Sequence, residues 1–413
     1  MNRKVVVTGL GAITPLGNDV DTFWNNLIAG KLGIGPITRF DTTDYAVKIG
    51  AEVKDFDPKD YMDKGDVRKS DHNVHMAVAA AVQAVADSGI EGHFDPERTG
   101  VYFGSGIGGI ETFEDTYQKL LEKGPRFVSP YFIPMMIPNM AAGTIAIRYG
   151  MRGPALPAVS ACASGTNAIG EALRAVRHGY CDVMVTGGTE AALTRSSVAG
   201  FIKMQALNMT DDVEHASLPF HKDRGGFVIG EGAGALVVES EEHAKARGAK
   251  IYAELAGYGS TCDAHHMTAP DPEAKAGSKA IKDAYDECCK EGIIDPTKVY
   301  VNAHGTGTPL NDKSETIALK KVFGDDAYKL QISSTKSMTG HMLGGTGAVE
   351  AVASILTIKN GIVPPTINLD VPDPECDLNY TPNEAVKGEF DCALSTSLGF
   401  GGHNACIGFK KYE

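Results

Sequence analysis

The chain has 413 residues, of which 43% are hydrophobic, and a formal net charge of −13. This length predicts two domains or one large duplicated domain, and the charge argues against nucleic acid and anionic membranes as partners. The eight cysteines form no Cys-x-x-Cys pair, and no apolar run reaches the roughly 18 residues of a membrane-spanning helix. The cysteine spacing argues against a zinc site. Because no signal peptide is visible at the start, we expect a reduced, cytoplasmic protein.

Strand-like and helical runs alternate along the chain, and several strand-like runs end in glycine. In chain order, the expected strands cover residues 3–9, 99–103, 182–186, 225–240 (after a glycine loop), 250–259, 299–303, 332–335 and 394–397, and the expected helices cover 15–29, 71–88, 110–121, 275–291 and 348–358. Residues 187–193 are interpreted as a turn carrying Glu190. The Pro/Met-rich residues 125–158 are interpreted as a loop over a pocket or across a subunit interface. This alternation predicts an α/β protein with largely parallel sheets covered by helices.

The pattern that opens the chain returns near residue 250. Residues 3–9 run from basic residues through a β-branched strand to glycine, and residues 250–259 repeat that order. We therefore expect two similar halves, residues 1–250 and residues 251–413.

Cys162 lies where an extended run ends and a helical run begins, within Ser-Ala-Cys-Ala-Ser-Gly at 160–165. A helix N-terminus carries partial positive charge, which favours thiolate over thiol, and the small neighbours let a substrate approach closely. This is the setting of a nucleophilic cysteine, although a buried structural cysteine at a strand-to-helix turn gives the same pattern.

Three segments of the second half share one order: a buried strand, then polar residues, then glycine. They carry His304 in 301–309, Lys336 and His341 in 334–345, and Phe400 in 397–404. Because ligands gather at the carboxyl ends of strands in open α/β sheets, these side chains could converge on Cys162. Each residue is weak evidence alone, but a nucleophile, a base and oxyanion donors together are the working set for acyl transfer.

Together these motifs resemble those of the β-ketoacyl-acyl carrier protein synthases, which are condensing acyltransferases of the thiolase-like superfamily. The likeness covers essentially the whole chain, includes Asn-Met-Ala-Ala-Gly at 139–143 and Gly-Phe-Val-Ile-Gly-Glu-Gly-Ala-Gly at 226–234, and is greatest to the elongating type II synthases. The resemblance implies a five-layer αβαβα sandwich built from two duplicated halves, and a homodimer. It implies chain elongation in fatty acid synthesis by decarboxylative Claisen condensation of acyl- and malonyl-loaded acyl carrier protein. No metal or redox cofactor is implied, because the phosphopantetheine arrives on the carrier protein.

Carried onto this chain, the resemblance makes Cys162 the acylated nucleophile. It implies that His304 and His341 promote malonyl decarboxylation and donate hydrogen bonds to the enolate oxygen. Lys336, near Glu350, matches a lysine that orients the histidines rather than moving a proton.

The same resemblance assigns residues to the oxyanion hole, the gate and the pockets. The backbone N–H groups of Cys162 and Phe400 would form the oxyanion hole, and Phe400 would block the acyl pocket until the cysteine is loaded. The flanking glycines, Gly399, Gly401 and Gly402, make that loop movement cheap. Other positions match the pantetheine contacts, Thr306 and Thr308, and the acyl-pocket walls, Ile107 and Phe201.

Docking of an acidic carrier protein requires local basic residues on a chain that is acidic overall. The positions in the regions that the family uses for docking are Lys64, Arg68, Lys69 and Lys203. Four positions near or before the pocket motifs depart from the usual family pattern: Leu218, His221, Thr396 and Leu398. These departures put the substrate range or the movement of the gate in question.

Other functions fit parts of the sequence less well. Residues 104–109 match the dinucleotide-binding pattern Gly-x-Gly-x-x-Gly, but no strand ending in Asp or Glu follows about 20 residues on. His72 and His75 share a helix face without an evident third metal ligand. A cysteine hydrolase would favour Gly-x-Cys-x-Gly, and here Ser160 and Ser164 flank Cys162. A polyketide-type ketosynthase stays open, whereas a non-catalytic chain-length partner would lack the cysteine.

Overall fold

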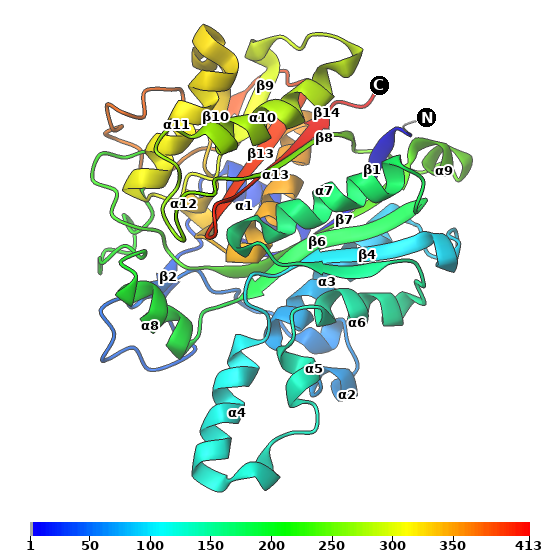
Figure 1. Cartoon of the computed structure of the whole chain (residues 1–413), viewed down its shortest axis with the longest axis vertical. Coiled ribbons are helices and arrows are strands. Elements are labelled where there is room, and N and C mark those ends of the chain that lie inside the picture. Colours follow the sequence, from blue (N-terminus) through cyan, green and yellow to red (C-terminus); the bar gives the residue numbers. More distant parts are fainter. Residues whose placement is uncertain (1–2) are drawn as a thin grey trace.

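The computed structural model describes residues 3–413, and its ten-stranded sheet divides into two halves of five strands each (Figure 1). The first half comprises β1 (Val5–Ile13), α1 (Val20–Ile28), β2 (Gly35–Pro36), β3 (Ile49–Gly50), α2 (Lys64–Val67), α3 (His72–Ser88), β4 (Thr99–Gly104), α4 (Ile110–Lys123), α5 (Phe132–Met136), α6 (Met140–Tyr149), β5 (Ala155–Ala158), α7 (Ser164–Arg177), β6 (Val183–Ala191), α8 (Arg195–Lys203), β7 (Glu231–Ser240) and α9 (Glu241–Ala246).

The second half repeats the core of the first. It comprises β8 (Ala253–Cys262), α10 (Lys275–Cys288), β9 (Val299–Asn302), α11 (Pro309–Phe323), β10 (Gln331–Ser333), α12 (Lys336–Thr339), α13 (Thr346–Asn360), β11 (Ile362–Val363), β12 (Val386–Lys387), β13 (Cys392–Gly399) and β14 (His403–Lys410). The sequence boundary expected after residue 250 falls between α9 and β8.

The strand order displays the duplication directly. Outward from the junction of β1 with β8, the first half runs β1, β7, β6, β4, β5 and the second runs β8, β14, β13, β9, β10. In both halves the inner two pairings are antiparallel and the outer two are parallel. The two half-sheets join through only two paired positions, Val6 with Glu254 and Val7 with Ala253.

The alternation of side chains along each strand builds the five layers. On β7, Leu236 and Val238 face the central helices α7 and α13, whereas Val237 between them faces α3 and α6. On β13, Ala393 faces the centre and Leu394 faces α10 and α11. Figure 1 shows α10 and α11 above, α3 and α6 below, and α7 between them. The expected five-layer sandwich is confirmed.

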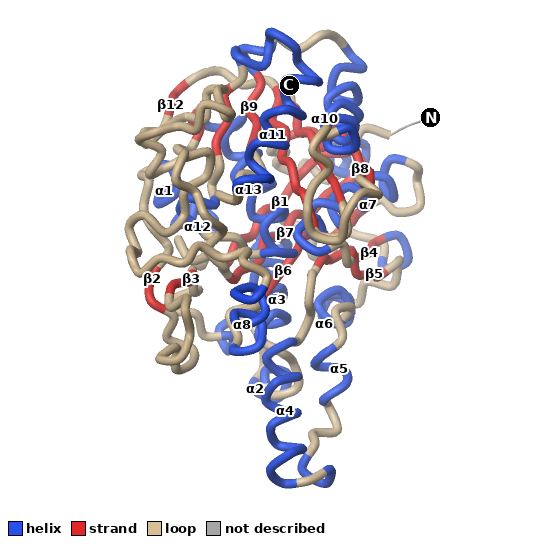
Figure 2. Tube along the Cα trace, turned by 60° about the vertical axis from the view of Figure 1, so that its left-hand side comes forward, coloured by secondary structure: helices blue, strands red, loops and turns tan. Residues whose placement is uncertain are grey.

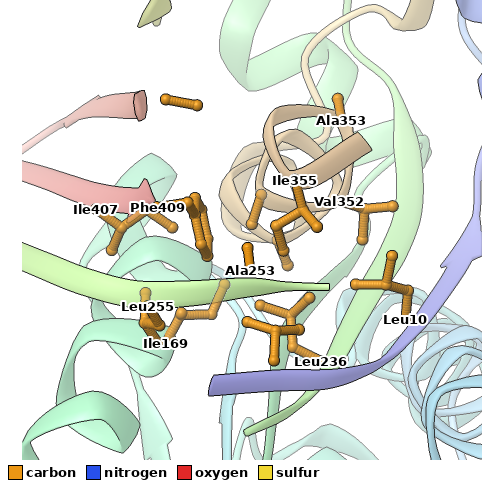
Figure 3. Packing of buried hydrophobic residues seen from close by; sticks show 14 of the residues in the cluster. Leu10, Ile169, Leu236, Ala253, Leu255, Val352, Ala353, Ile355, Ile407 and Phe409 are labelled. Atoms are coloured by element: carbon orange, nitrogen blue, oxygen red, sulfur yellow. The ribbon is translucent and has the colours of Figure 1, made fainter. Parts of the chain in front are cut away.

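The central layer lies buried between the two half-sheets. Every residue of α13 from Thr346 to Ile358 is buried, which is the pattern of a helix covered on all sides. Figure 3 shows α13 side chains such as Val352 and Ile355 among residues of β8 and β14, including Leu255 and Phe409. This packing brings both halves of the chain to one shared core.

The structure corrects several expectations. Residues 187–193 are not a turn, because β6 continues through Ala191 and carries Glu190 inside the strand. The segment 125–158 is not a simple loop, since it contains α5, α6 and β5. The sheet is mixed rather than largely parallel, because strands buried on both faces look alike in sequence whatever their direction. Ten further elements were not expected, namely α2, α8, α9, α11, α12, β2, β3, β11, β12 and β14.

Helices α4 and α5 form an arm that projects from the body of the molecule (Figures 1 and 2). Apolar side chains of this arm are exposed, namely Phe113, Tyr117, Leu120, Leu121, Phe127, Tyr131 and Ile133. Among the described residues, no helix has the length and apolar character needed to span a bilayer.

The crossing of α7 and α13 yields a stability prediction. A Cβ atom on Gly347 would lie 2.0 Å from the Thr166 hydroxyl oxygen, so the helices could not approach as they do. We expect Gly347→Ala to lower the free energy of unfolding by about 1–3 kcal/mol, the usual cost of overpacking. The control is Gly200→Ala on α8, where a Cβ meets nothing within 4 Å and better helix propensity should stabilise slightly. Urea unfolding of both variants checks this, and equal behaviour would contradict it.

Candidate active site

Cys162 lies in a sharp turn between β5 and the start of α7. The turn is a single 3₁₀ segment, Ala161–Ala163, and Ala161 has a φ of 51°, in the left-handed region. The Ser164 hydroxyl closes the turn by donating to the Ala161 carbonyl (2.6 Å) and accepting the Ser160 N–H (2.9 Å). Cys162 is buried, with 8% of the residue exposed, and it lines the cavity through which a substrate would reach its thiol.

The loop of Phe400 packs directly against this turn. A Cβ atom on Gly399 would lie 2.7 Å from the Ser160 carbonyl oxygen and 3.2 Å from the Cys162 nitrogen, which is why glycine is needed there. The backbone N–H groups of Cys162 and Phe400 both act on the Cys162 sulfur and help to lower its pKa. Two backbone donors therefore meet at the nucleophile.

The two histidines enter the site from separate loops and face each other. His304 follows β9, and His341 follows α12. Their ring centroids lie 5.2 Å apart with the planes at 86°. The His341 Nδ1 atom is 3.0 Å from the Thr346 hydroxyl, and its backbone is held between Val228 and Gly230.

A buried carboxylate that the sequence analysis did not identify supports the His304 loop. Glu315 of α11 is 1% exposed and accepts the backbone N–H groups of His304 (2.7 Å) and Gly305 (2.8 Å). The Thr396 hydroxyl also donates to Glu315 (2.6 Å). Nothing in the local pattern of α11 marks this glutamate, because its partners are a neighbouring loop and a strand 81 residues away.

Lys336 and Glu350 form an ion pair behind the histidines. The Lys336 Nζ atom is 2.6 Å from the Glu350 carboxylate, and each side chain is 1% exposed. Burial raises the pKa of the Glu350 carboxyl to about 7, while the Lys336 charge opposes that rise. Neither residue lines the cavity, so the pair acts on the site through its charge and by holding its loops.

The protonation states differ from the sequence expectation at the nucleophile. Burial raises the pKa of the Cys162 thiol to about 12, and the nearby Lys336 charge only partly offsets this. Burial thus opposes the thiolate that the helix N-terminus would favour. Burial and the Lys336 charge also hold the pKa of both His304 and His341 well below the ordinary value, so both imidazoles are neutral. A protonated thiol thus lies with two neutral imidazoles.

One cavity of about 530 Å³ gathers most of the candidate residues. Its walls include Ile107, Cys162, Phe201, His304, Thr306, Thr308, His341 and Phe400. The Thr306 and Thr308 hydroxyl oxygens are 3.0 Å apart. Of the predicted site residues, only Lys336 and Glu350 lie outside this lining.

The four departures from the usual family pattern have separate places. Leu398 lines the cavity, and Thr396 bonds Glu315 behind it. The Leu218 backbone packs beside Gly307, since a Cβ atom on that glycine would be in van der Waals contact with it. The His221 ring accepts the N–H of Asp223 and does not line the cavity.

The glycine loop at 104–109 and His72, which resembled binding motifs in the sequence, make contacts within the chain. The glycine loop after β4 is bound to Glu190, which accepts the N–H groups of Gly106 and Ile107. His72 is engaged by Arg39, and no group of three or more His, Cys, Asp or Glu side chains within residues 3–413 is arranged to hold a metal ion.

Comparison with known proteins defines the class. Residues 2–244 match the N-terminal domain of β-ketoacyl synthases, and residues 252–370 match the C-terminal domain. The chain belongs to this family, whose members are condensing enzymes of the acyltransferase class.

Individual relatives match over their full lengths. A 3-oxoacyl-[acyl-carrier-protein] synthase 2 from Staphylococcus aureus (strain COL) is 51% identical over 413 residues, covering 100% of this chain and 99% of the relative. The ishigamide ketosynthase/chain length factor superposes with a TM-score of 0.93 at 36% identity, and covers 100% of each chain. A type II polyketide ketosynthase (AntDE) in complex with its acyl-carrier protein, AntF, has a TM-score of 0.91 at 34% identity, again over 100% of both chains.

The neutral histidines predict a pH-dependent stability. Because both pKa values are lower in the folded chain than in the unfolded one, the unfolded chain binds more protons below pH 6.5, and acidification destabilises the fold. Each histidine adds up to about 1.4 kcal/mol per pH unit to this slope. Between pH 6.5 and 5, we expect the free energy of unfolding of the double variant His304→Asn, His341→Asn to change less steeply with pH. The slope should be smaller by up to about 2.7 kcal/mol per pH unit.

Urea unfolding at a series of pH values measures this slope. The surface variant His93→Asn is the control and should retain the slope of the unmodified protein. Parallel profiles for the double variant and the unmodified protein would show that the two histidines are not held neutral.

Proposed function

We propose that the protein is a 3-oxoacyl-[acyl-carrier-protein] synthase that elongates acyl chains in fatty acid synthesis. The observation that carries this proposal is the cavity in which Cys162, His304 and His341 meet. The 51% identity to a 3-oxoacyl-[acyl-carrier-protein] synthase 2 over the whole chain supports it. The chemistry divides into acyl transfer to the cysteine and decarboxylative condensation.

In the first step, the Cys162 sulfur attacks the thioester carbonyl of an acyl-loaded carrier protein. The thiol must lose its proton as it attacks, because burial keeps it protonated at rest. A neutral imidazole can accept that proton and return it to the departing pantetheine thiolate. The N–H groups of Cys162 and Phe400 stabilise the oxyanion that forms on the carbonyl oxygen.

In the second step, a malonyl-loaded carrier protein loses carbon dioxide, and the electron pair passes to an enolate. Neutral His304 and His341 are suited to donate N–H hydrogen bonds to the enolate oxygen. A Thr346 hydroxyl that donates to the His341 Nδ1 atom leaves the proton on Nε2, which is free to donate. The enolate carbon attacks the acyl-Cys162 carbonyl, and the cysteine thiolate leaves and regains a proton.

Lys336 and Glu350 orient this site rather than transfer protons. The ammonium favours neutral imidazoles, and its bond to Glu350 fixes the start of α12 relative to α13. No metal or redox cofactor takes part in the proposed chemistry, because the phosphopantetheine arrives on the carrier protein.

Phe400 is proposed as a gate on the acyl pocket bounded by Ile107 and Phe201. Its loop is held by two backbone hydrogen bonds to the segment that follows β8. The Gly401 N–H donates to the Met267 carbonyl (2.7 Å), and the Asp263 N–H donates to the Gly402 carbonyl (2.8 Å). Gly401 and Gly402 have φ angles of 85° and 77°, so glycine permits this loop conformation.

An acidic acyl carrier protein is the proposed partner, in line with the carrier complex of the ketosynthase relative. The proposed docking residues Lys64, Arg68, Lys69 and Lys203 are exposed, and none of them forms an ion pair with another described residue. Lys203 adjoins Met204, which lines the cavity. Thr306 and Thr308 would hold the incoming pantetheine arm.

A homodimer in the cytoplasm is also proposed. The exposed apolar side chains of the arm and the exposed Leu156 on the edge strand β5 support it, because such surfaces normally meet a partner. Sedimentation at the mass of a single 43.7 kDa chain would overturn this proposal.

A polyketide-type ketosynthase is the second candidate, and the two polyketide-type relatives at 34–36% identity favour it. The higher identity to the fatty acid enzyme makes fatty acid elongation the first choice. The presence of Cys162 with both histidines argues against a non-catalytic partner subunit.

Substitution of the nucleophile tests the reaction. Cys162→Ser should lose condensation by roughly 100-fold or more, because an alcohol is a far weaker nucleophile than a thiol. Cys162→Gln should decarboxylate malonyl carrier protein without condensing, because its amide takes the place of the acyl group. Intact-mass measurement with a series of acyl carrier proteins should place the acyl adduct on Cys162. A Cys162→Ala protein that still elongates chains would contradict the mechanism.

Charge reversal at the mouth of the cavity tests carrier docking. Lys203→Glu should raise KM for acyl carrier protein about tenfold and leave acylation by a free acyl-pantetheine unchanged. Lys387→Glu on β12, outside the cavity lining, is the control with the same change of charge. An equal KM for both variants would exclude Lys203 from the dock.

A further inference from the structure

Glu190 is a buried carboxylate near the reacting groups that the proposed mechanism does not use. It lies near the end of β6 with no exposed surface. Four donors converge on its two oxygens: the N–H groups of Gly106 (2.7 Å), Gly344 (3.0 Å) and Ile107 (3.2 Å), and the Ser105 hydroxyl (3.0 Å). All four are donors, so the arrangement suits an ionised carboxylate, which accepts every one of them.

These donors belong to two loops that come from different halves of the chain. Ser105, Gly106 and Ile107 follow β4, and Ile107 lines the cavity. Gly344 lies three residues after His341, in the turn that precedes α13. A Cβ atom on Gly344 would lie 2.3 Å from the Gly106 nitrogen and 2.8 Å from the Glu190 oxygen, so the loops touch at the carboxylate.

Gly106, which donates to Glu190, also packs against the turn that carries Cys162. A Cβ atom on Gly106 would lie 3.3 Å from the carbonyl oxygen of Ala161, the residue before Cys162. The Glu190 charge also contributes to the raised pKa of the Cys162 thiol. Burial raises the pKa of Glu190 itself, and its hydrogen bonds oppose that rise.

We propose that Glu190 is a positioning residue that joins the acyl-pocket loop at 105–107 to the loop that carries His341. The hydrogen bonds of Glu190 to both loops fix the position of Ile107, in the wall of the acyl pocket, relative to the imidazole of His341, which acts on malonyl. The proposal rests on the proposed function, since it assigns a role within that reaction. A carboxylate is required because an amide in its place would aim an NH₂ group at a backbone N–H.

Glu190→Gln tests the proposal with two separate activities. In the Cys162→Gln background, we expect malonyl carrier protein decarboxylation to fall about tenfold when Glu190→Gln is added, because the His341 loop shifts. In the protein with Cys162 intact, we expect acylation by a C6–C16 series of acyl carrier proteins to change its chain-length profile. Iodoacetamide alkylation of Cys162 near neutral pH should instead rise about threefold or more, because a negative charge near the sulfur is removed.

Glu239→Gln is the matched control for loss of a buried carboxylate. Glu239 is also fully buried, but it bonds Thr8, His243 and Arg247 away from the cavity. Its variant should be destabilised without a change in chain-length profile or in the alkylation rate. Ser105→Ala removes one of the four donors to Glu190 and should shift decarboxylation in the same direction by a smaller factor.

The outcomes separate this inference from the proposed function. Cys162→Gln protein that fails to decarboxylate malonyl carrier protein would overturn the proposed function. If that protein is active and the addition of Glu190→Gln leaves decarboxylation, chain-length profile and alkylation within twofold, the positioning role is wrong. The positioning role would also be wrong if Glu190→Gln changed the measured activities only as Glu239→Gln does and Ser105→Ala left decarboxylation unchanged. Glu190 would then have a structural role alone.

Discussion

The buried ion pair between Lys336 and Glu350 sets the electrostatics of the whole site. An ammonium without a partner at this depth would cost several kcal/mol, so Glu350 is what allows the charge to remain. That charge helps to hold His304 and His341 neutral and partly offsets the effect of burial on Cys162. The proposed acceptor of the thiol proton and the proposed donors to the enolate thus depend on one contact outside the cavity.

The duplication explains how one cavity receives residues from both halves. The 3₁₀ turn before α7 carries Cys162, and its counterpart before α13 carries Gly344. Both turns begin with a residue in the left-handed region, Ala161 at 51° and Leu343 at 43°. Because α7 and α13 pack together between the half-sheets, the two turns come side by side. Equivalent places in the two repeats therefore hold different chemistry within one site.

Burial favours one order of proton movements in the proposed reaction. Burial raises the pKa of the Cys162 thiol to about 12, which favours the protonated thiol before a thioester arrives. Neutral imidazoles can then take part in both steps, first as an acceptor and later as donors. The carboxylates Glu190 and Glu315 keep the surrounding loops in place by accepting backbone N–H groups.

The sequence by itself determined many of the longer strands and helices of the core, the duplication, and the candidates Cys162, His304, His341, Lys336 and Phe400. Those features are local: a strand pattern followed by a short polar and glycine motif can be read within about ten residues. Strand direction could not be predicted in this way, because β7 and β14 have the same buried character as parallel strands.

The tertiary structure alone decided the protonation states and the supporting carboxylates. The Glu190 carboxylate bonds an N–H group 154 residues away, so no local pattern marks its partner, and its place inside β6 was mistaken for a turn. The helix N-terminus favours a thiolate, whereas desolvation of Cys162, which arises once the half-sheets enclose the sulfur, raises the pKa of its thiol. Burial and partners distant in sequence exist only after the two halves have packed together.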